Sequence, residues 1–252
     1  MHISNVRENL DKIRRIYRRT GTDILGGTAK DVLDVAEARA VAMWDEFKRD
    51  KKRNPDWGYD ISEAAPLRFK PSRVLKDAIV DVYCKIRWSE ESSVPCKQDI
   101  KVRVWSEDSS IIYRSDLDSE CVEKELTDPA RIQPGRVISR FHFDRANLSN
   151  GSRRQYHPEF HVQIGGIPGS HELCWHPKGF NLPRIPYQPM ELLMTCQLVA
   201  INFFPAEYGD IAKEPDWKDQ LHSTQKLILL DYYQLCRDTI WQKDSLLDRL
   251  RA

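Results

Sequence analysis

In the stretch AIVDVYCKIRW, residues 78–88, apolar and charged side chains alternate with a period of two, and this alternation indicates the fold class. Its apolar side chains are Val80, Val82, Cys84, Ile86 and Trp88, and its charged side chains between them are Asp81, Lys85 and Arg87. A β-strand points successive side chains to opposite faces of a sheet. The stretch therefore predicts a strand with one apolar face and one solvated face.

Four more segments continue this pattern downstream. They are DIKVRVW (99–105), SSIIYRSD (109–116), VISRFHFD (137–144) and EFHVQIG (159–165). No helical pattern interrupts them, which favours an antiparallel meander of about five strands with one solvated face.

Helical patterns flank the predicted sheet on both sides. Residues 3–19 place apolar side chains at three- and four-residue steps, and a second helix is predicted from an N-cap at Thr28 to about Lys48. After a long loop rich in Pro and Gly, Pro189 opens a helix that Pro205 ends, and a last helix covers about 224–250. The sequence thus predicts an α+β fold, with N-terminal helices and a C-terminal helical layer on the apolar face of the sheet.

The connection KRDKKRNPDWGYD, residues 48–60, is charged and broken by proline. It suggests an N-terminal helical segment at 1–60 and an α+β core domain at 61–252. One continuous domain over the whole chain is the alternative, because a chain of this length can bury a single core.

Composition limits the classes of function. The 252 residues are 40% hydrophobic and carry a net charge of +1, so contact with nucleic acid would have to come from a local basic patch. No apolar run reaches the roughly 20 residues of a membrane span, and the first residues lack the apolar core of a secretory signal. We expect a cytoplasmic protein without membrane contact, whose six scattered cysteines are free thiols.

A group of candidate catalytic residues follows from strand parity. In 137–144 the side chains of His142 and Asp144 lie opposite the phenylalanines, and in 159–165 those of His161 and Gln163 lie opposite the apolar set. If the two strands pair as a hairpin, the four polar side chains meet on one face, since cross-strand neighbours are about 5 Å apart. Two imidazoles and a carboxylate are suitable groups for acid–base chemistry. The alternative is an ordinary solvated sheet face, and the sequence leaves both open.

A metal site is not predicted. On a strand, the HxxxH spacing separates His157 and His161 by roughly 13 Å, too far for one ion. Cys174 and His176 form a CxH pair, which is not a zinc spacing on its own, so His176 is kept only as a candidate binding residue. The sequence also lacks GxxxxGK[ST], GxSxG, HExxH and GxGxxG, and no cofactor is expected.

Several arginines are candidates for binding an anion. Arg153 and Arg154 lie in the connection between the last two strands, and Arg184 is held between prolines in LPRIPY. Such a guanidinium could bind a phosphate or a carboxylate, or it could cap or pair with a neighbouring element. The arginines of helix 3–19 indicate a solvated face, or a contact with a nucleic-acid backbone or an acidic partner.

The order of short motifs after residue 140 resembles a group of bacterial proteins. The motifs are FHFD (141–144), HPxxH (157–161), Gly165-Gly166, PRxP (183–186) and NFF (202–204). This order is similar to that of uncharacterised bacterial proteins from mobile and defence-related gene neighbourhoods and, more distantly, to TumE-type toxins of toxin–antitoxin pairs. The resemblance covers about residues 136–205 and implies a bacterial protein of antiviral defence or of a toxin–antitoxin pair.

Two functions are therefore expected as alternatives. The first is a binding or assembly subunit of a bacterial defence or toxin–antitoxin system, with a protein partner and with nucleic acid as a further partner through local basic patches. The second is a metal-independent phosphodiesterase or ribonuclease that uses His142, Asp144 and His161. In that enzyme, Gln163, Arg153, Arg154, Arg184 and His176 would bind the substrate.

Overall fold

The computed structural model describes residues 1–19, 23–75, 78–90, 92–106, 136–145, 159–164 and 185–241. Of these, residues 75, 136–138 and 238–241 are described by their backbone alone. The helices are α1 (Ile3–Ile16), α2 (Ala29–Arg49), the 3-10 turn η1 (Arg73–Leu75), α4 (Leu192–Phe203), α5 (Pro205–Ile211) and α6 (Pro215–Trp241). The strands are β1 (Trp57–Ile61), β2 (Leu67–Arg68), β3 (Ile79–Trp88), β4 (Lys97–Ser106), β5 (Arg136–Arg145), β6 (Phe160–Ile164) and β7 (Ile185–Pro186).

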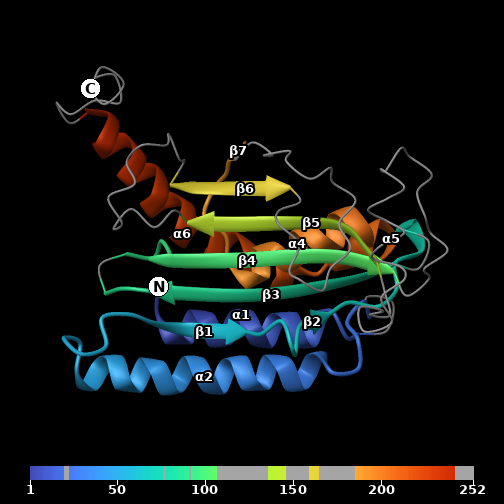
Figure 1. The fold of residues 1–252 in the computed structure, drawn as a ribbon, viewed down its shortest axis with the longest axis horizontal. Coiled ribbons are helices and arrows are strands. Elements are labelled where there is room, and N and C mark those ends of the chain that lie inside the picture. Colours follow the sequence, from blue (N-terminus) through green and yellow to red (C-terminus); the bar gives the residue numbers. More distant parts are fainter. Residues whose placement is uncertain are drawn as a thin grey trace, which may run out of the picture.

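The strands form one antiparallel sheet in the order β1-β3-β4-β5-β6-β7, with β2 also paired to β3 (Figure 1). This confirms the predicted α+β class. The sheet has 7 strands among the described residues, where about five were expected. The additional strands β1, β2 and β7 are too short to show a clear period-two pattern. The predicted strand 109–116 lies outside the described residues, and β4 pairs directly with β5.

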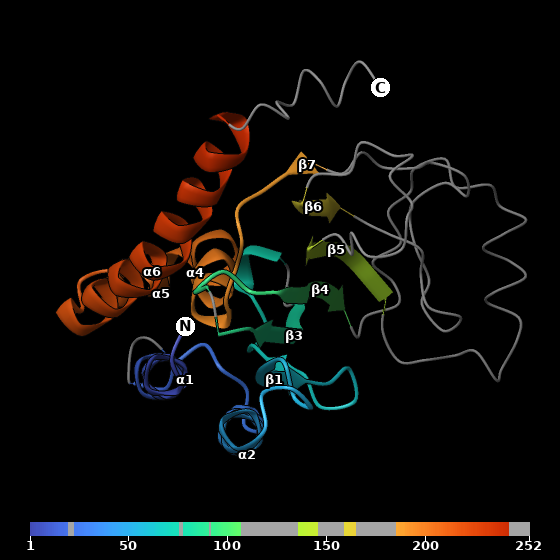
Figure 2. The same ribbon diagram turned by 90° about the vertical axis from the view of Figure 1, so that its left-hand side faces the viewer.

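The helices are arranged around one side and one edge of the sheet. Figure 2 shows α1, α4, α5 and α6 on the same side, while α2 runs along the edge formed by β1 and β2. The apolar sides of α1, α2, α4 and α6 share a hydrophobic core with the sheet, with Leu10, Leu33, Val82, Val199 and Trp217 as buried members. The predicted helical layer on the apolar face is therefore present.

Strand β3 is buried more completely than the alternation in its sequence suggests. Lys85 is its only exposed side chain, while Asp81 and Arg87 are buried. Arg87 donates through Nη2 to both oxygens of Asp60 at 2.7 Å and through Nη1 to the carbonyl of Tyr59 at 2.7 Å. The prediction of a solvated face was wrong at Asp81 and Arg87, which are buried because polar partners on neighbouring strands compensate their burial.

Several helix boundaries differ from the prediction. Helix α4 begins at Leu192 rather than at Pro189, because the carboxylate of Glu191 accepts a bond from the Leu193 amide and caps the helix. The predicted helix ends before Pro205 as expected, but Pro205 also begins α5. Proline is tolerated there because the first N–H groups of a helix have no partner within the helix. Helix α6 begins at Pro215, nine residues before the predicted start.

Two further observations concern the described helices and cysteines. The described helices include none that is both long and apolar enough to cross a bilayer. The cysteines of the described residues, Cys84, Cys96, Cys196 and Cys236, are free thiols.

Candidate functional site

The face of the sheet opposite the helices carries a continuous set of polar side chains, which we call the polar face. Its members on β4, β5 and β6 are Asp99, Lys101, Arg103, Arg140, His142, Asp144, His161 and Gln163. The register places His142 opposite Gln163 and Asp144 opposite His161, which confirms the hairpin predicted for these two strands.

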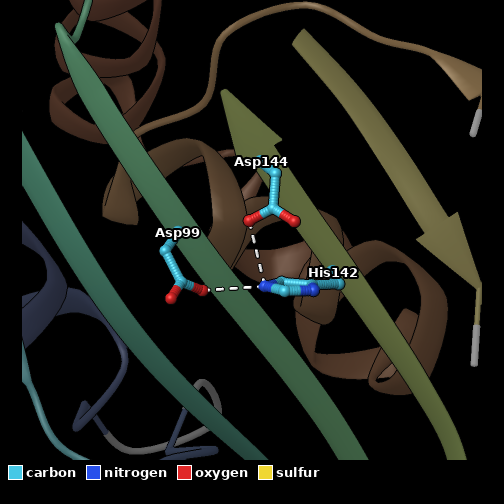
Figure 3. Close-up of side chains that lie close together, drawn as sticks. All are labelled: Asp99, His142 and Asp144. Atoms are coloured by element: carbon cyan, nitrogen blue, oxygen red, sulfur yellow. Dashed lines mark hydrogen bonds and ion pairs between the residues drawn. The ribbon is translucent and has the colours of Figure 1, made fainter. Parts of the chain in front are cut away.

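Three of these side chains converge on one point (Figure 3), and we call them the carboxylate–histidine cluster. The Nε2 atom of His142 lies 2.8 Å from Oδ1 of Asp99 and 3.0 Å from Oδ1 of Asp144. Asp99 belongs to β4, whereas His142 and Asp144 belong to β5. The register pairs Asp99 directly with Asp144, so both carboxylates approach the same imidazole nitrogen.

The cluster is open to solvent on one side and buried on the other. The side chain of Asp99 is 49% exposed, while His142 and Asp144 are 24% and 23% exposed. His161 lies on the buried side, with its side chain 3% exposed and its Nε2 atom 3.9 Å from Oδ2 of Asp144. A ligand from solvent would therefore meet Asp99 and His142 before it met His161.

The two carboxylates change the proton affinity of the imidazole between them. Burial lowers the pKa of His142, but the hydrogen bonds to Asp144 and Asp99 outweigh this and raise the pKa to about 9. The same bond to His142 lowers the pKa of Asp99. At neutral pH the raised pKa favours a protonated His142 ring, and the two carboxylates together hold that proton.

A second group of charges occupies the other end of the polar face, and we call it the arginine cluster. The carboxylate of Asp81 is fully buried and accepts bonds from Arg68 at 2.9 and 3.1 Å, from Arg103 at 3.2 Å and from the Trp105 indole at 2.8 Å. The guanidinium groups of Arg68 and Arg103 lie 4.9 and 5.9 Å from the Trp105 ring centroid. One buried carboxylate therefore orients two cationic side chains against an aromatic ring.

On strands β4 and β5 the polar face has an acidic end and a basic end. Asp99 and Asp144 lie opposite each other at the acidic end, and Arg103 and Arg140 lie opposite each other at the basic end. Between them, Lys101 lies opposite His142 and binds Glu63 at 2.9 Å. The face thus presents both signs of charge in a fixed order.

The sequence located only part of this arrangement. The sequence predicted that His142, Asp144, His161 and Gln163 share one face, and the strand register confirms this. The other candidate binding residues, Arg153, Arg154, Arg184 and His176, lie outside the described residues. The sequence analysis did not predict Asp99 as a site residue. Alternation in 99–105 places its side chain on the face of the strand opposite Ile100, but its contact with His142 depends on the pairing of β4 with β5.

The arginines of the first helix are engaged in ion pairs within the chain. Arg7 binds Glu37 at 2.9 Å, and Arg14 binds Asp34 and Glu37 at 2.9 and 3.1 Å, which joins α1 to α2. Arg19 follows α1 and binds Glu214 at 2.6 Å, next to the start of α6. These contacts favour a structural role for Arg7, Arg14 and Arg19 over contact with a nucleic-acid backbone.

Comparison with protein families, with curated proteins and with solved structures finds no match to this chain.

Proposed function

We propose that this protein is a binding or assembly subunit of a bacterial defence or toxin–antitoxin system, and that it docks a protein partner through the polar face. One observation carries the docking role. The polar face displays ordered and partly exposed charges, and no described α-helix covers it (Figure 2). The resemblance of the motifs around β5 and β6 supports the bacterial setting.

The order of charges favours a protein over a nucleic acid as the partner. A nucleic-acid backbone would be attracted to Arg103 and Arg140 but repelled by Asp99 and Asp144 at the other end of the same face. A protein surface can present both signs in the matching order, and such complementarity gives specificity. The net charge of +1 likewise provides no general attraction for nucleic acid.

A metal-independent phosphodiesterase or ribonuclease is the second candidate, favoured by the position of Asp144 between two imidazoles. Its Oδ1 lies 3.0 Å from Nε2 of His142, and its Oδ2 lies 3.9 Å from Nε2 of His161. In such an enzyme His142 and His161 would share proton transfer, and Asp144 would orient them. This candidate ranks second because the side chain of His161 is 3% exposed, which keeps a substrate away from it.

Charge reversal at the centre of the polar face tests the docking role. Lys101→Glu reverses the charge of a lysine of the polar face that pairs with Glu63. Lys30→Glu is the matched control, because Lys30 on α2 likewise pairs with a carboxylate, that of Asp34 at 2.7 Å. The tagged chain is isolated from its native host, and the stoichiometry of copurified protein is measured. We expect a stoichiometric partner with wild type and Lys30→Glu, and a loss of affinity of about tenfold or more with Lys101→Glu.

Two results would contradict the docking role. Equal partner recovery with Lys101→Glu and Lys30→Glu would remove the polar face as the docking surface. A monomeric wild type that cleaves RNA, DNA or nucleotides, with activity lost by orders of magnitude in His142→Ala and His161→Ala, would establish the enzyme in its place.

A further inference from the structure

We propose that Asp99, His142 and Asp144 form a binding site for one divalent transition-metal ion, for which Zn²⁺ is the probe. The proposal goes beyond the docking role and does not depend on it, because it rests on the geometry of the carboxylate–histidine cluster alone. Its ligands would be one imidazole nitrogen and two carboxylate oxygens.

The ligand atoms already lie at distances that suit a single ion. One ligand atom from each residue can be chosen so that all three lie within 4.8 Å of one another. The His142 nitrogen is 2.8 and 3.0 Å from the nearest oxygens of Asp99 and Asp144. An ion about 2.1 Å from each ligand holds neighbouring ligand atoms roughly 3.0–3.4 Å apart. Small side-chain rotations would therefore admit the ion.

A proton satisfies this geometry less well than a metal ion does. The Nε2 atom of His142 carries at most one proton, yet carboxylate oxygens from two residues lie within hydrogen-bond distance of it. One proton can form a linear bond to only one of them. Asp99 and Asp144 are also directly paired across β4 and β5, where like charges destabilise a sheet. A divalent ion would displace the proton from His142 Nε2, bind all three groups and neutralise both carboxylates.

The chemistry of the ligands selects the class of ion. Imidazole nitrogen suits Zn²⁺, Fe²⁺, Ni²⁺ and Cu²⁺, whereas Ca²⁺ and Mg²⁺ prefer oxygen ligands throughout. Three protein ligands leave at least one coordination position for water or for another ligand. The 49% exposure of the Asp99 side chain gives access from solvent, and His161, 3.9 Å from Asp144 Oδ2, is placed to orient that carboxylate from the buried side.

Metal titration of the full chain without an affinity tag tests the site. After treatment with a chelator and desalting, ZnCl₂, MnCl₂ and MgCl₂ are titrated by calorimetry. We expect one Zn²⁺ per chain, weaker Mn²⁺ binding and Mg²⁺ binding at least about 100-fold weaker than Zn²⁺. Asp99→Asn and Asp144→Asn should each weaken Zn²⁺ binding tenfold or more. Asp45→Asn on α2 is the matched control and should leave the affinity unchanged.

A second readout locates the ion. Bound Mn²⁺ should broaden the NMR signals of His142 and of the residues around Asp99 in wild type, and should leave them sharp in Asp99→Asn. Because Asp99 is half-exposed, its variant is expected to fold, and circular dichroism checks this. Zn²⁺ affinity that is equal in wild type and in both variants, or no saturable binding at 100 μM Zn²⁺, would overturn the proposal. Lys101→Glu retains all three ligands, so failure of partner docking and failure of metal binding are distinguishable.

Discussion

His142 lies between two carboxylates, and its protonation is linked to the stability of the fold. Burial lowers its pKa, but the bonds to Asp144 and Asp99 raise it to about 9, above the ordinary value of 6.5. The protonated His142 ring therefore stabilises the folded state fully below about pH 6.5, and this stabilisation is lost as the pH rises through about 9. The charged and titratable groups around His142 are Asp144 on its own strand, Asp99 and Lys101 on β4, and His161 on β6, which lies next to Asp144.

We predict that the His142 ring of the metal-free protein titrates near pH 9, measured by NMR. Asp99→Asn should move this midpoint toward 6.5, because one of the two carboxylates that stabilise the imidazolium is removed. Between pH 6.5 and 9, the free energy of unfolding of wild type should fall by about 1–2 kcal/mol, after allowance for partial solvent screening. A wild-type midpoint near 6.5 would contradict the hydrogen bonds assigned to His142.

At the scale of the element, β1 approaches β3 so closely that one position excludes any side chain. Gly58 pairs with Arg87, and a Cβ atom at Gly58 would lie 2.0 Å from the backbone oxygen of Ile86. The obstacle is backbone rather than the end of a flexible side chain, so the strand itself would have to move. This contact is a property of the paired strands and leaves no signature in the local sequence.

Gly58→Ala should destabilise the protein by about 2–3 kcal/mol, because β1 must shift away from β3. Gly27→Ala is the matched control, since a Cβ atom at Gly27 meets nothing within 4 Å. We expect the control to change the free energy of unfolding by less than about 0.5 kcal/mol. Urea denaturation of the three proteins measures both values, and equal stability of the two variants would contradict the close approach of β1.

At the scale of the molecule, a buried polar network connects segments that are far apart in the chain. Asn9 of α1 accepts bonds from Gln220 at 2.7 Å and Thr224 at 2.9 Å, both on α6. Glu191, at the start of α4, accepts a bond from Tyr59 of β1 at 3.0 Å. Burial raises the pKa of Glu191 despite these bonds. Together with the shared hydrophobic core, the network joins the N-terminal helices to the rest of the fold.

We therefore predict one cooperative unfolding transition for the whole chain, with the same midpoint by far-UV circular dichroism and by tryptophan fluorescence. Asn9→Ala should cost about 2–3 kcal/mol, because the buried donors on α6 lose their acceptor. Asn202→Ala is the control, since Asn202 is exposed and donates a bond to the Leu198 carbonyl within α4. Two separate transitions would instead support a division of the chain near residue 60.

Local patterns in the sequence were sufficient to predict strands β3 to β6 and to predict which face of the sheet each of their side chains occupies. The period of two in 78–88, 99–105, 137–144 and 159–165 predicted β3, β4, β5 and β6, and it placed His142 with Asp144, His161 and Gln163. Parity is a property of consecutive residues, because the backbone geometry of a strand imposes it whatever the neighbouring strand is. Together with the helical patterns on either side, this alternation predicted the α+β class.

The site itself depends on contacts between distant residues. Asp99 and His142 are 43 positions apart in the sequence and meet only because β4 pairs with β5. No local pattern specifies that partner strand or its register. The burial of Asp81 and Arg87 likewise depends on Arg68 and Asp60 from neighbouring strands. The sequence alone thus determined which side chains share a face of a strand. Tertiary structure decided which faces meet, because strand pairing is selected by the packing of the whole chain rather than by its nearest neighbours.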